Sequence, residues 1–414
     1  MSVPAWVGLS VPARVGLVVG AYFTSIAVTG FMPLWYSDRG ISAEDIGLIL
    51  GTATFLRILA GPGWGNVTDR IGRRRPVLLV AGLAATGMAL MFVPTRDFYL
   101  LALVAAGQGI AASALNPLID SLALALAREG RMEYGPVRAI GSATFMVTTA
   151  TVGSLLAAIG SWVVPWLIAA GYGLATLFSR FLPEAEAPPA VARSLKGAGL
   201  FRNRGFCLAV LSSGLIQGSH AAYYGFAALF WRSQGFSDTV IGLLLAEGII
   251  MEILLFARGR RLIAYLGPAG LTFCAALACA IRWGATAASP PLAILALIQL
   301  LHAATFAMQH ISAMTVLSRH VPVERAATAQ ALHGALGFGA PSGIMMLTAG
   351  WLYAHYDGVA FLAMAVVGGA AMLVALPLAR LESAQGVVQG GAPGDAQGDA
   401  QRSVTDSDPS SDRR

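Results

Sequence analysis

The sequence predicts an all-α membrane protein in which twelve transmembrane helices form two pseudo-symmetric bundles of six. Three observations predict this fold: an apolar composition, the recurrence of long apolar segments, and an internal repeat. Of the 414 residues, 56% are hydrophobic and 12% are charged, whereas about 25% of the residues of a soluble protein carry a charge. Segments such as 77–93 are apolar on every face. This excludes a transmembrane β-barrel, because barrel strands alternate apolar and polar residues.

The apolar segments are long enough to cross a membrane as helices, each of which needs about 20 apolar residues. Turn-forming and charged residues separate them, so we expect helices at 14–37, 43–65, 76–94, 98–125, 136–159, 162–181, 204–231, 239–257, 268–287, 291–317, 325–351 and 357–380. The first segment lacks a basic start and a small-residue cleavage site, and we therefore expect a retained helix and not a signal peptide.

Basic residues indicate the orientation of these helices, because short cytoplasmic loops retain Lys and Arg. If the first helix enters from the cytoplasm, 20 of the 27 Lys and Arg residues fall in inner loops and termini, and only Arg39, Arg96 and Arg232 fall in outer loops. We therefore expect a multi-pass protein of the cell inner membrane with both termini in the cytoplasm. The basic residues form no contiguous stripe, so we expect no nucleic-acid partner.

Two polar segments divide the chain into domains. Residues 183–203 include the sequence PEAEAPPAVARSLKGAG, which is typical of a linker. We expect this cytoplasmic linker to join an N-terminal six-helix bundle, 1–182, to a C-terminal six-helix bundle, 204–382. After Arg380 the chain turns to Gly, Gln, Ser and Asp, and we expect 383–414 to be a disordered cytoplasmic tail.

The two halves of the sequence repeat each other. An offset of 195 residues aligns 41-ISAEDIGLILGTATFLRI-58 with 236-FSDTVIGLLLAEGIIMEI-253. Parallel repeats of six helices are the architecture of transporters that rock two bundles around a site near the middle of the membrane. The same offset relates Arg57 to Glu252, so we expect these two side chains to face one cavity from opposite bundles without direct contact.

Charged residues within the predicted helices mark candidate functional positions. Each costs about 2.5 to 3.5 kcal/mol at the centre of a spanning helix, so we expect them to face the interior, paired or hydrated. They are Arg57, Asp120, Arg138, Glu247, Glu252 and Arg282. A carboxyl group that carries a proton must bind it when buried and release it when an Arg approaches. Glu252 and Asp120 are the strong candidates, because Glu247 lies about 140° around the helix from Glu252.

Polar side chains recur at helical spacing on three predicted helices and would line a wet passage. They are Ser213, Gln217, His220 and Tyr224 on the seventh helix, Gln299, His302 and Gln309 on the tenth, and Ser113, Asn116 and Asp120 on the fourth. For His220 and His302 the alternative is a hydrogen-bonded packing residue without a role in transport. For Asp120 and Arg138 the alternative is a static bridge between the fourth and fifth helices.

The loop after the second helix carries a distinct motif, 65-GNVTDRIGRRR-75. This motif resembles the signature loop of the major facilitator superfamily, which implies the major facilitator fold. The resemblance also implies a gating loop formed by Gly65, Asp69, Arg70, Gly72, Arg73 and Arg74. The alternative is that these charges only set the topology. The copy in the second half, 258-RGRRLIAYLGP-268, has Ala264 in place of the Asp, so we do not expect a symmetric second latch.

Four further segments narrow the resemblance. The segments 116-NPLIDSLAL-124, 134-YGPVRAIGS-142, 217-QGSHAAYYGF-226 and 299-QLLHAATFAMQH-310 are similar to the phenylpropionate permease branch of the superfamily, which is related to the proton-coupled lactose permease. The resemblance implies that Asp120 and Arg138 hold substrate and that Arg282 and His302 belong to the proton machinery. The Glu that the lactose permease carries on its tenth helix would fall at Thr305, so the proton-carrying carboxylate must lie elsewhere or be absent.

The sequence therefore predicts a secondary active transporter that works by alternating access. We expect proton-coupled symport of a small organic solute such as 3-phenylpropionate or another aromatic carboxylate, in which Arg residues bind the carboxylate and Tyr and Phe pack against the ring. The alternative is a proton-coupled drug or metabolite exporter. Segment 136–160 lacks the Gly-Pro motif that drug antiporters of the superfamily carry in this helix, which disfavours export.

Other function classes lack their motifs. The chain has no G-x-x-x-x-G-K-[ST] loop for ATP and neither H-E-x-x-H nor G-x-S-x-G, which argues against an ATP-driven pump and against an enzyme. A transport-inactive sensor with the same fold remains an alternative. The cysteines Cys207, Cys274 and Cys279 have no metal-ligand spacing. We expect no cofactor and no metal, a monomer, and only a small-molecule substrate, protons and the lipid bilayer as partners.

Overall fold

A computed structural model describes residues 9–184 and 197–390. The first half contains α1 (Val11–Thr29) continued by α2 (Met32–Asp38), α3 (Ala43–Ile71), α4 (Arg74–Met91), α5 (Phe98–Ala112) continued by α6 (Leu115–Arg128), α7 (Tyr134–Ile159), and α8 (Val164–Ser179) after the short turn η2 (Ser161–Val163). These elements form six helical segments that follow the predicted boundaries to within a few residues, except at the end of α3.

The second half begins with the turn η3 (Gly197–Arg202) and contains six further segments. The seventh segment is α9 (Arg204–Gly218) with α10 (Ala221–Ser233), the eighth is α11 (Asp238–Ala257), and the ninth is α12 (Gly259–Ala287). The tenth consists of α13 (Leu292–Gln299), the π-helical turn η4 (Ala304–Met308) and α14 (Gln309–His320). The eleventh consists of η5 (Val323–Arg325), α15 (Ala326–His333), the π-helical turn η6 (Gly334–Gly339) and α16 (Ala340–Tyr356), and the twelfth is α17 (Val359–Gly369) with α18 (Ala371–Gly390).

The predicted all-α membrane fold is confirmed. Across the described ranges there are helices and no strands, and eleven helices are long and apolar enough to cross a membrane. The remaining segment consists of α9 and α10, which Ser219 and His220 separate. Each segment is apolar because lipid offers no hydrogen-bond partner to a backbone group, and a helix satisfies those groups internally.

Three boundaries differ from the prediction. Helix α12 begins at Gly259, nine residues before the expected start at 268, and is interrupted at Gly267 by a non-helical φ of 64° and ψ of 171°. Helix α3 continues to Ile71 and ends at Gly72, whose φ of 68° is the left-handed conformation that glycine adopts without strain. Helix α18 continues to Gly390, so residues 383–390, which we expected to be disordered, are helical. A helix that has already formed extends at little cost, because each added residue gains a hydrogen bond without a new nucleation step. The rest of the expected tail, 391–414, and linker residues 185–196 lie outside the described residues.

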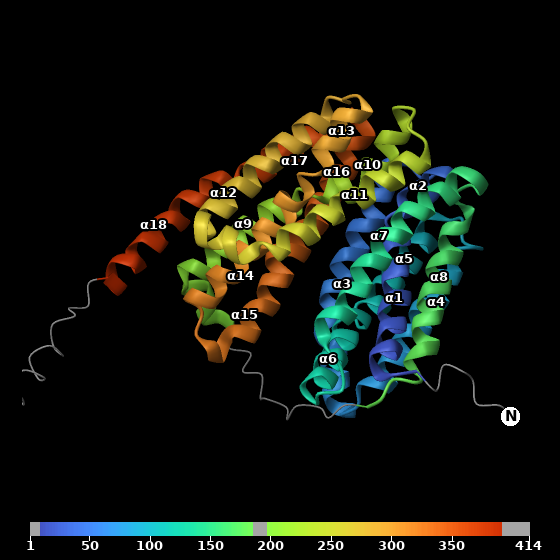
Figure 1. The fold of residues 1–414 in the computed structure, drawn as a ribbon. Helices are drawn as coiled ribbons and strands as arrows, with labels where there is room; N and C mark the ends of the chain where they lie inside the picture. Colours follow the sequence, from blue (N-terminus) through green and yellow to red (C-terminus); the bar gives the residue numbers. More distant parts are fainter. Residues whose placement is uncertain (1–8, 185–196, 391–414) are drawn as a thin grey trace, which may run out of the picture.

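The helices form two bundles that contact each other at one end (Figure 1). Helix α3 packs on α16, α7 packs on α11, and α2 contacts α10. Glycines bring the backbones together, since a Cβ atom added at Gly47 would lie 2.7 Å from Cα of Gly350, and one added at Gly153 would lie 2.8 Å from Cα of Gly242. We call this the closed end of the molecule. Toward the other end, where α6 and α15 lie, the bundles diverge in Figure 1.

An ion pair joins the bundles at the closed end. Arg232, at the end of α10, lies with Nη1 2.9 Å from Oδ1 of Asp38 in α2, in the opposite bundle. The same guanidinium donates from Nε and Nη2 to both carboxylate oxygens of Asp238, at 2.9 and 2.7 Å. Ser161 donates a hydrogen bond to the other oxygen of Asp38. Arg232 therefore holds the first turn of α11 and the end of α2 at one point.

Asp38→Asn should weaken the closed end while leaving the pair of Arg232 with Asp238 intact. An exposed ion pair is worth about 0.2 to 1 kcal/mol, so we expect up to about a fivefold increase in the population with separated bundles at this end. The alkylation rate of a single cysteine at Ile46→Cys, a buried position of the interface, in a chain without the native cysteines, measures that population. Glu44→Gln, a nearby exposed carboxylate, is the matched control. Equal alkylation rates in Asp38→Asn and its parent would contradict the assignment.

Candidate functional site

A fully buried arginine, Arg282 of α12, is the centre of the polar cluster in the second half. Its Nη2 donates to Oε1 of Gln299 at 2.8 Å, and its Nη1 donates to Nδ1 of His302 at 2.9 Å. The guanidinium also lies 4.4 Å from the ring centres of Tyr223 and Trp283. Cation–π attraction and neutral acceptors thus replace water around this charge, which no carboxylate in the described part of the chain contacts directly.

His302 lies between Arg282 and the carboxyl group of Glu252 and contacts both. Because a guanidinium only donates, Nδ1 of His302 is an acceptor, and in the neutral imidazole the proton is on Nε2. This Nε2 lies 3.5 Å from Oε2 of Glu252 in α11. Arg282, His302 and Glu252 therefore form a line from the buried core to a carboxyl group whose side chain is 23% exposed.

Thr305 connects this line to His220. Nδ1 of His220 lies 2.9 Å from the carbonyl oxygen of Ile216, so Nδ1 carries the proton in the neutral ring. Nε2 of His220 lies 3.1 Å from the hydroxyl oxygen of Thr305, which accepts from Nη1 of Arg282 at 3.3 Å and also lies 3.0 Å from the carbonyl oxygen of His302, so the single hydroxyl proton serves either Nε2 or this carbonyl. Thr305 is fully buried in the π-helical turn η4, a type of turn that occurs frequently at functional sites.

In the first half, Asp120 of α6 and Arg138 of α7 lie near each other without a direct bridge. The hydroxyl of Tyr134 donates to Oδ1 of Asp120 at 3.4 Å, and the guanidinium of Arg138 lies 4.6 Å from the ring centre of Phe23. Among the described residues, these two side chains form no ion pair with each other within 4.0 Å. The static bridge that we considered for them is therefore absent, although Arg138 is within electrostatic range of both Asp120 and Glu252.

The remaining residues that the sequence singled out are distributed over both halves. Arg57 is exposed on α3, and Asn116 is half-buried on α6. Gln217 is buried in α9, and its Oε1 has no hydrogen-bond partner among the described residues. Tyr224 is 45% exposed and stacks on His220 with a ring separation of 5.8 Å. The structure thus brings His220, Tyr224, Glu252, Arg282 and His302 together and leaves Arg57 and Asn116 apart from them.

Sequence reasoning missed three partners of this cluster. Tyr223 and Trp283 looked like ordinary apolar residues, yet both rings pack on the guanidinium of Arg282. Thr305 was noted only as the position of a missing Glu, yet it bonds both His220 and Arg282. The contact of Trp283 could have been predicted, because an aromatic residue directly follows an intramembrane Arg in the sequence. The contact of Tyr223 could not, because this residue approaches from another helix.

The predicted gating loop is partly helical. Gly65, Asp69 and Arg70 belong to α3, and the loop consists of only Gly72 and Arg73 before α4 begins at Arg74. Nη2 of Arg73 lies 3.2 Å from Oε1 of Glu184, which follows α8. Nη1 of Arg75 donates to the carbonyl oxygen of Leu182 at 3.1 Å. The start of the third segment is thus tied to the end of the sixth.

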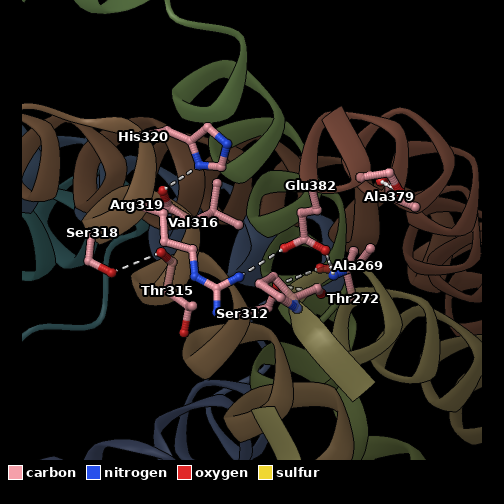
Figure 2. A network of polar contacts seen from close by, with 12 residues as sticks. Ala269, Thr272, Ser312, Thr315, Val316, Ser318, Arg319, His320, Ala379 and Glu382 are labelled. Carbon is pink, nitrogen blue, oxygen red and sulfur yellow. Dashed lines mark hydrogen bonds and ion pairs between the residues drawn. The ribbon is translucent and has the colours of Figure 1, made fainter. Parts of the chain in front are cut away.

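The second half has a corresponding arrangement, built from different residues, where we expected no second latch. Gly267, 195 positions after Gly72, also has a positive φ of 64°, but its ψ of 171° differs from the ψ of 1° at Gly72. Figure 2 shows Glu382 of α18 accepting from the backbone N–H of Ala269 at 3.3 Å, with Nη1 of Arg319 3.7 Å from its Oε1. The start of the ninth segment is thus tied to the end of the twelfth, by an acid that the motif at 258–268 does not contain.

Thr305→Val should destabilise the protein, because it keeps the shape of the side chain but leaves Nε2 of His220 and one N–H of Arg282 buried without a partner. An unsatisfied buried group costs about 1 to 3 kcal/mol, and we expect the free energy of unfolding to fall by that amount. Thermal unfolding in detergent measures it. Thr315→Val is the matched control, since the hydroxyl of Thr315 bonds only the carbonyl oxygen of Ile311 in its own helix. Equal stability of the two variants would show that the hydroxyl of Thr305 is not required.

Known proteins resemble this chain along nearly its whole length. The chain is 29% identical over 360 residues to the "Probable 3-phenylpropionic acid transporter" of Escherichia coli (strain K12), a match that covers 85% of this chain and 94% of the relative. It is 28% identical over 352 residues to the maltose permease of Geobacillus stearothermophilus, covering 84% and 89% of the two chains.

The fold and the family agree with these relatives. The crystal structure of the nucleoside transporter NupG superposes with a TM-score of 0.76 at 17% identity, covering 89% of this chain and 98% of that one. Residues 19–363 match the MFS_1 like family. The resemblance to the major facilitator superfamily is therefore confirmed, and the chain, a multi-pass membrane transporter and not an enzyme, belongs to the MFS_1 like family.

Proposed function

We propose that this transporter couples proton movement to the import of a small aromatic carboxylate such as 3-phenylpropionate by alternating access. The observation that carries the proposal is the line from Arg282 through His302 to Glu252. Arg282 cannot release its proton at physiological pH, and His302 uses Nδ1 to accept from it. Glu252 is therefore the group of the line that exchanges a proton with solvent.

The geometry supports a sequence of steps at Glu252. In the carboxylate form, Oε2 faces Nε2–H of His302, and Arg282 fixes the ring that presents this proton. Arg138, within electrostatic range in the opposite bundle, favours the charged form. When the bundles move apart at this level, the attraction of Arg138 weakens and Glu252 binds a proton more readily. When they approach again, Glu252 releases it, which links protonation to the opening and closing of the two ends.

Aromatic and polar side chains near Glu252 suit an aromatic acid. Tyr224 and Phe338 are both partly exposed, at 45% and 40%, and Phe306 stacks on His302 at 5.9 Å. Aromatic faces of this kind pack against a substrate ring, and a few polar groups orient it. We assign substrate and proton contacts to Arg57, Asn116, Asp120 and Arg138 in the first half and to Gln217, His220, Tyr224, Glu252, Arg282 and His302 in the second.

Gating and topology complete the proposal. We assign to Gly65, Asp69, Arg70, Gly72, Arg73 and Arg74 the role of a latch that ties helix ends together and opens during the cycle. The protein would act as a monomer in the inner membrane, with its termini and the linker 183–203 in the cytoplasm between the bundles 1–182 and 204–382. The closed end in Figure 1 then faces outward, and the structure corresponds to the inward-facing state.

Glu252→Gln should abolish uphill accumulation of 3-phenylpropionate while leaving exchange of bound for free substrate. The amide keeps the shape of the carboxyl group but neither binds nor releases a proton at physiological pH. Accumulation under an inward proton gradient and exchange without one, in proteoliposomes, measure the two activities. Glu247→Gln, on the same helix but without a contact to His302, is the matched control and should accumulate substrate. Gradient-driven accumulation by Glu252→Gln would remove this residue from the proton path.

The substrate class itself is tested with a labelled panel of aromatic acids, sugars and nucleosides presented to the wild-type protein in the same vesicles. We expect gradient-dependent uptake of the aromatic acids. Uptake of sugars alone would retain proton symport but overturn the carboxylate assignment. Efflux in place of uptake would favour the exporter.

A further inference from the structure

Three arginines that lie away from the ends of membrane-spanning segments, Arg57, Arg138 and Arg282, differ in their surroundings. Arg282 has three hydrogen-bond partners and two aromatic faces. Arg138 lies over Phe23 and within electrostatic range of two carboxyl groups. Arg57 has neither a hydrogen bond nor an ion pair with any residue in the ranges 9–184 and 197–390. Its donors are therefore available, and, unlike Arg138, its guanidinium is not covered by an aromatic ring of the described residues.

Arg57 points into the protein and not toward lipid. Leu48 and Leu59, 42% and 73% exposed, mark the apolar outer face of α3, and they lie about 180° and 160° around the helix from Arg57 at 100° per residue. On its own side Arg57 is within electrostatic range of Tyr22 in α1 and Tyr172 in α8. Its neighbour Ile58 contacts Gly339 of the opposite bundle. Arg57 is therefore exposed on the side of α3 that faces Tyr22 and Tyr172, away from the outer face.

An exposed, inward-facing guanidinium without an acid is a receptor for an anion. Arginine is suited to a carboxylate, because two parallel N–H groups match its two oxygens. We infer that Arg57 binds the carboxylate group of the substrate and that one proton accompanies each carboxylate, so that transport is electroneutral. This inference rests on the proposed function and specifies both the anchor of the substrate and the charge that crosses the membrane.

The number of protons follows from the charge that the substrate brings. The three guanidinium groups of Arg57, Arg138 and Arg282 are always positive, so they release no proton when the substrate binds. Binding of a monoanionic carboxylate adds one negative charge. One proton taken up from the same side restores neutrality and is released with the substrate on the other side. A neutral interior is favoured during closure, because a net charge in a low dielectric is costly.

Glu252 is the group that takes up this proton. His302 approaches it from the segment between α13 and η4, His310 faces it from α14, and Arg138 faces it from α7. When Arg57 has bound a carboxylate, the negative charge of the substrate opposes that of Glu252 across the same space and favours protonation of Glu252. Substrate binding and proton binding then strengthen each other.

The anchor is tested by direct binding of radiolabelled 3-phenylpropionate to the purified full-length protein. Arg57→Gln should raise Kd by about tenfold or more, the loss expected for a charge-assisted hydrogen bond, and Arg57→Lys should recover part of it. Arg96→Gln, an arginine outside the spans, is the matched control and should bind like the wild type. Wild-type affinity in Arg57→Gln would overturn the assignment.

A second comparison begins with the wild-type protein, so its first result does not depend on the folding of a variant. The wild-type protein should bind 3-phenylpropionamide, which has the same shape without the charge, about tenfold or more weakly than the acid. Arg57→Gln should no longer distinguish the two compounds. Equal affinity of the wild type for acid and amide would exclude a carboxylate anchor at Arg57.

Electroneutrality is tested by the level of accumulation in proteoliposomes, after subtraction of the uptake that protein-free vesicles show for the neutral acid. A gradient of one pH unit should support about tenfold accumulation, and a potassium diffusion potential without a pH gradient should support none. Accumulation that changes with the potential would overturn the one-proton stoichiometry. A wild-type protein that neither binds nor transports any aromatic acid would instead overturn the proposed function itself.

Discussion

The burial of Arg282 is the constraint on which the second half of the structure depends. A guanidinium keeps its charge, so the protein must surround it with acceptors and aromatic faces where lipid and apolar side chains would offer nothing. These partners come from α10, α12 and the segment that joins α13 to α14. Three segments are therefore held in one relative arrangement, and the same hydrogen bonds determine which nitrogen of His302 faces Glu252.

The repeat preserves the scaffold and varies the interior. Gly72 and Gly267 both have a positive φ at related positions, and in each half an acid near the end of the sixth segment, Glu184 or Glu382, contacts the start of the third segment. The symmetry-related positions 57 and 252 carry side chains of opposite charge, Arg and Glu. A positive φ is a backbone requirement that glycine meets in both halves, whereas the side chains at related interior positions are free to differ in charge.

The closed end combines two kinds of contact with different physical consequences. At Gly47 with Gly350 and Gly153 with Gly242 the backbones touch because no Cβ intervenes. Such surfaces are smooth and interlock few side chains, which allows close approach and also separation. The pair of Arg232 with Asp38 adds a directional contact at the rim that is partly exposed to solvent. An interface of this composition is compatible with the rocking of two bundles that alternating access requires.

Sequence alone sufficed to identify the twelve apolar segments, the repeat and the charged residues of the interior, because the cost of a charge or a bare peptide group in lipid applies wherever the helix lies. It did not reveal which interior residues are partners. Asp120 and Arg138 have the expected spacing but do not pair, whereas Arg282 bonds His302 and Thr305 and packs on Tyr223. Nor did it identify Glu382 as the acid beside Ala269. Such pairings depend on how helices distant in the sequence cross and rotate against each other, and local patterns of apolar residues leave that rotation undetermined.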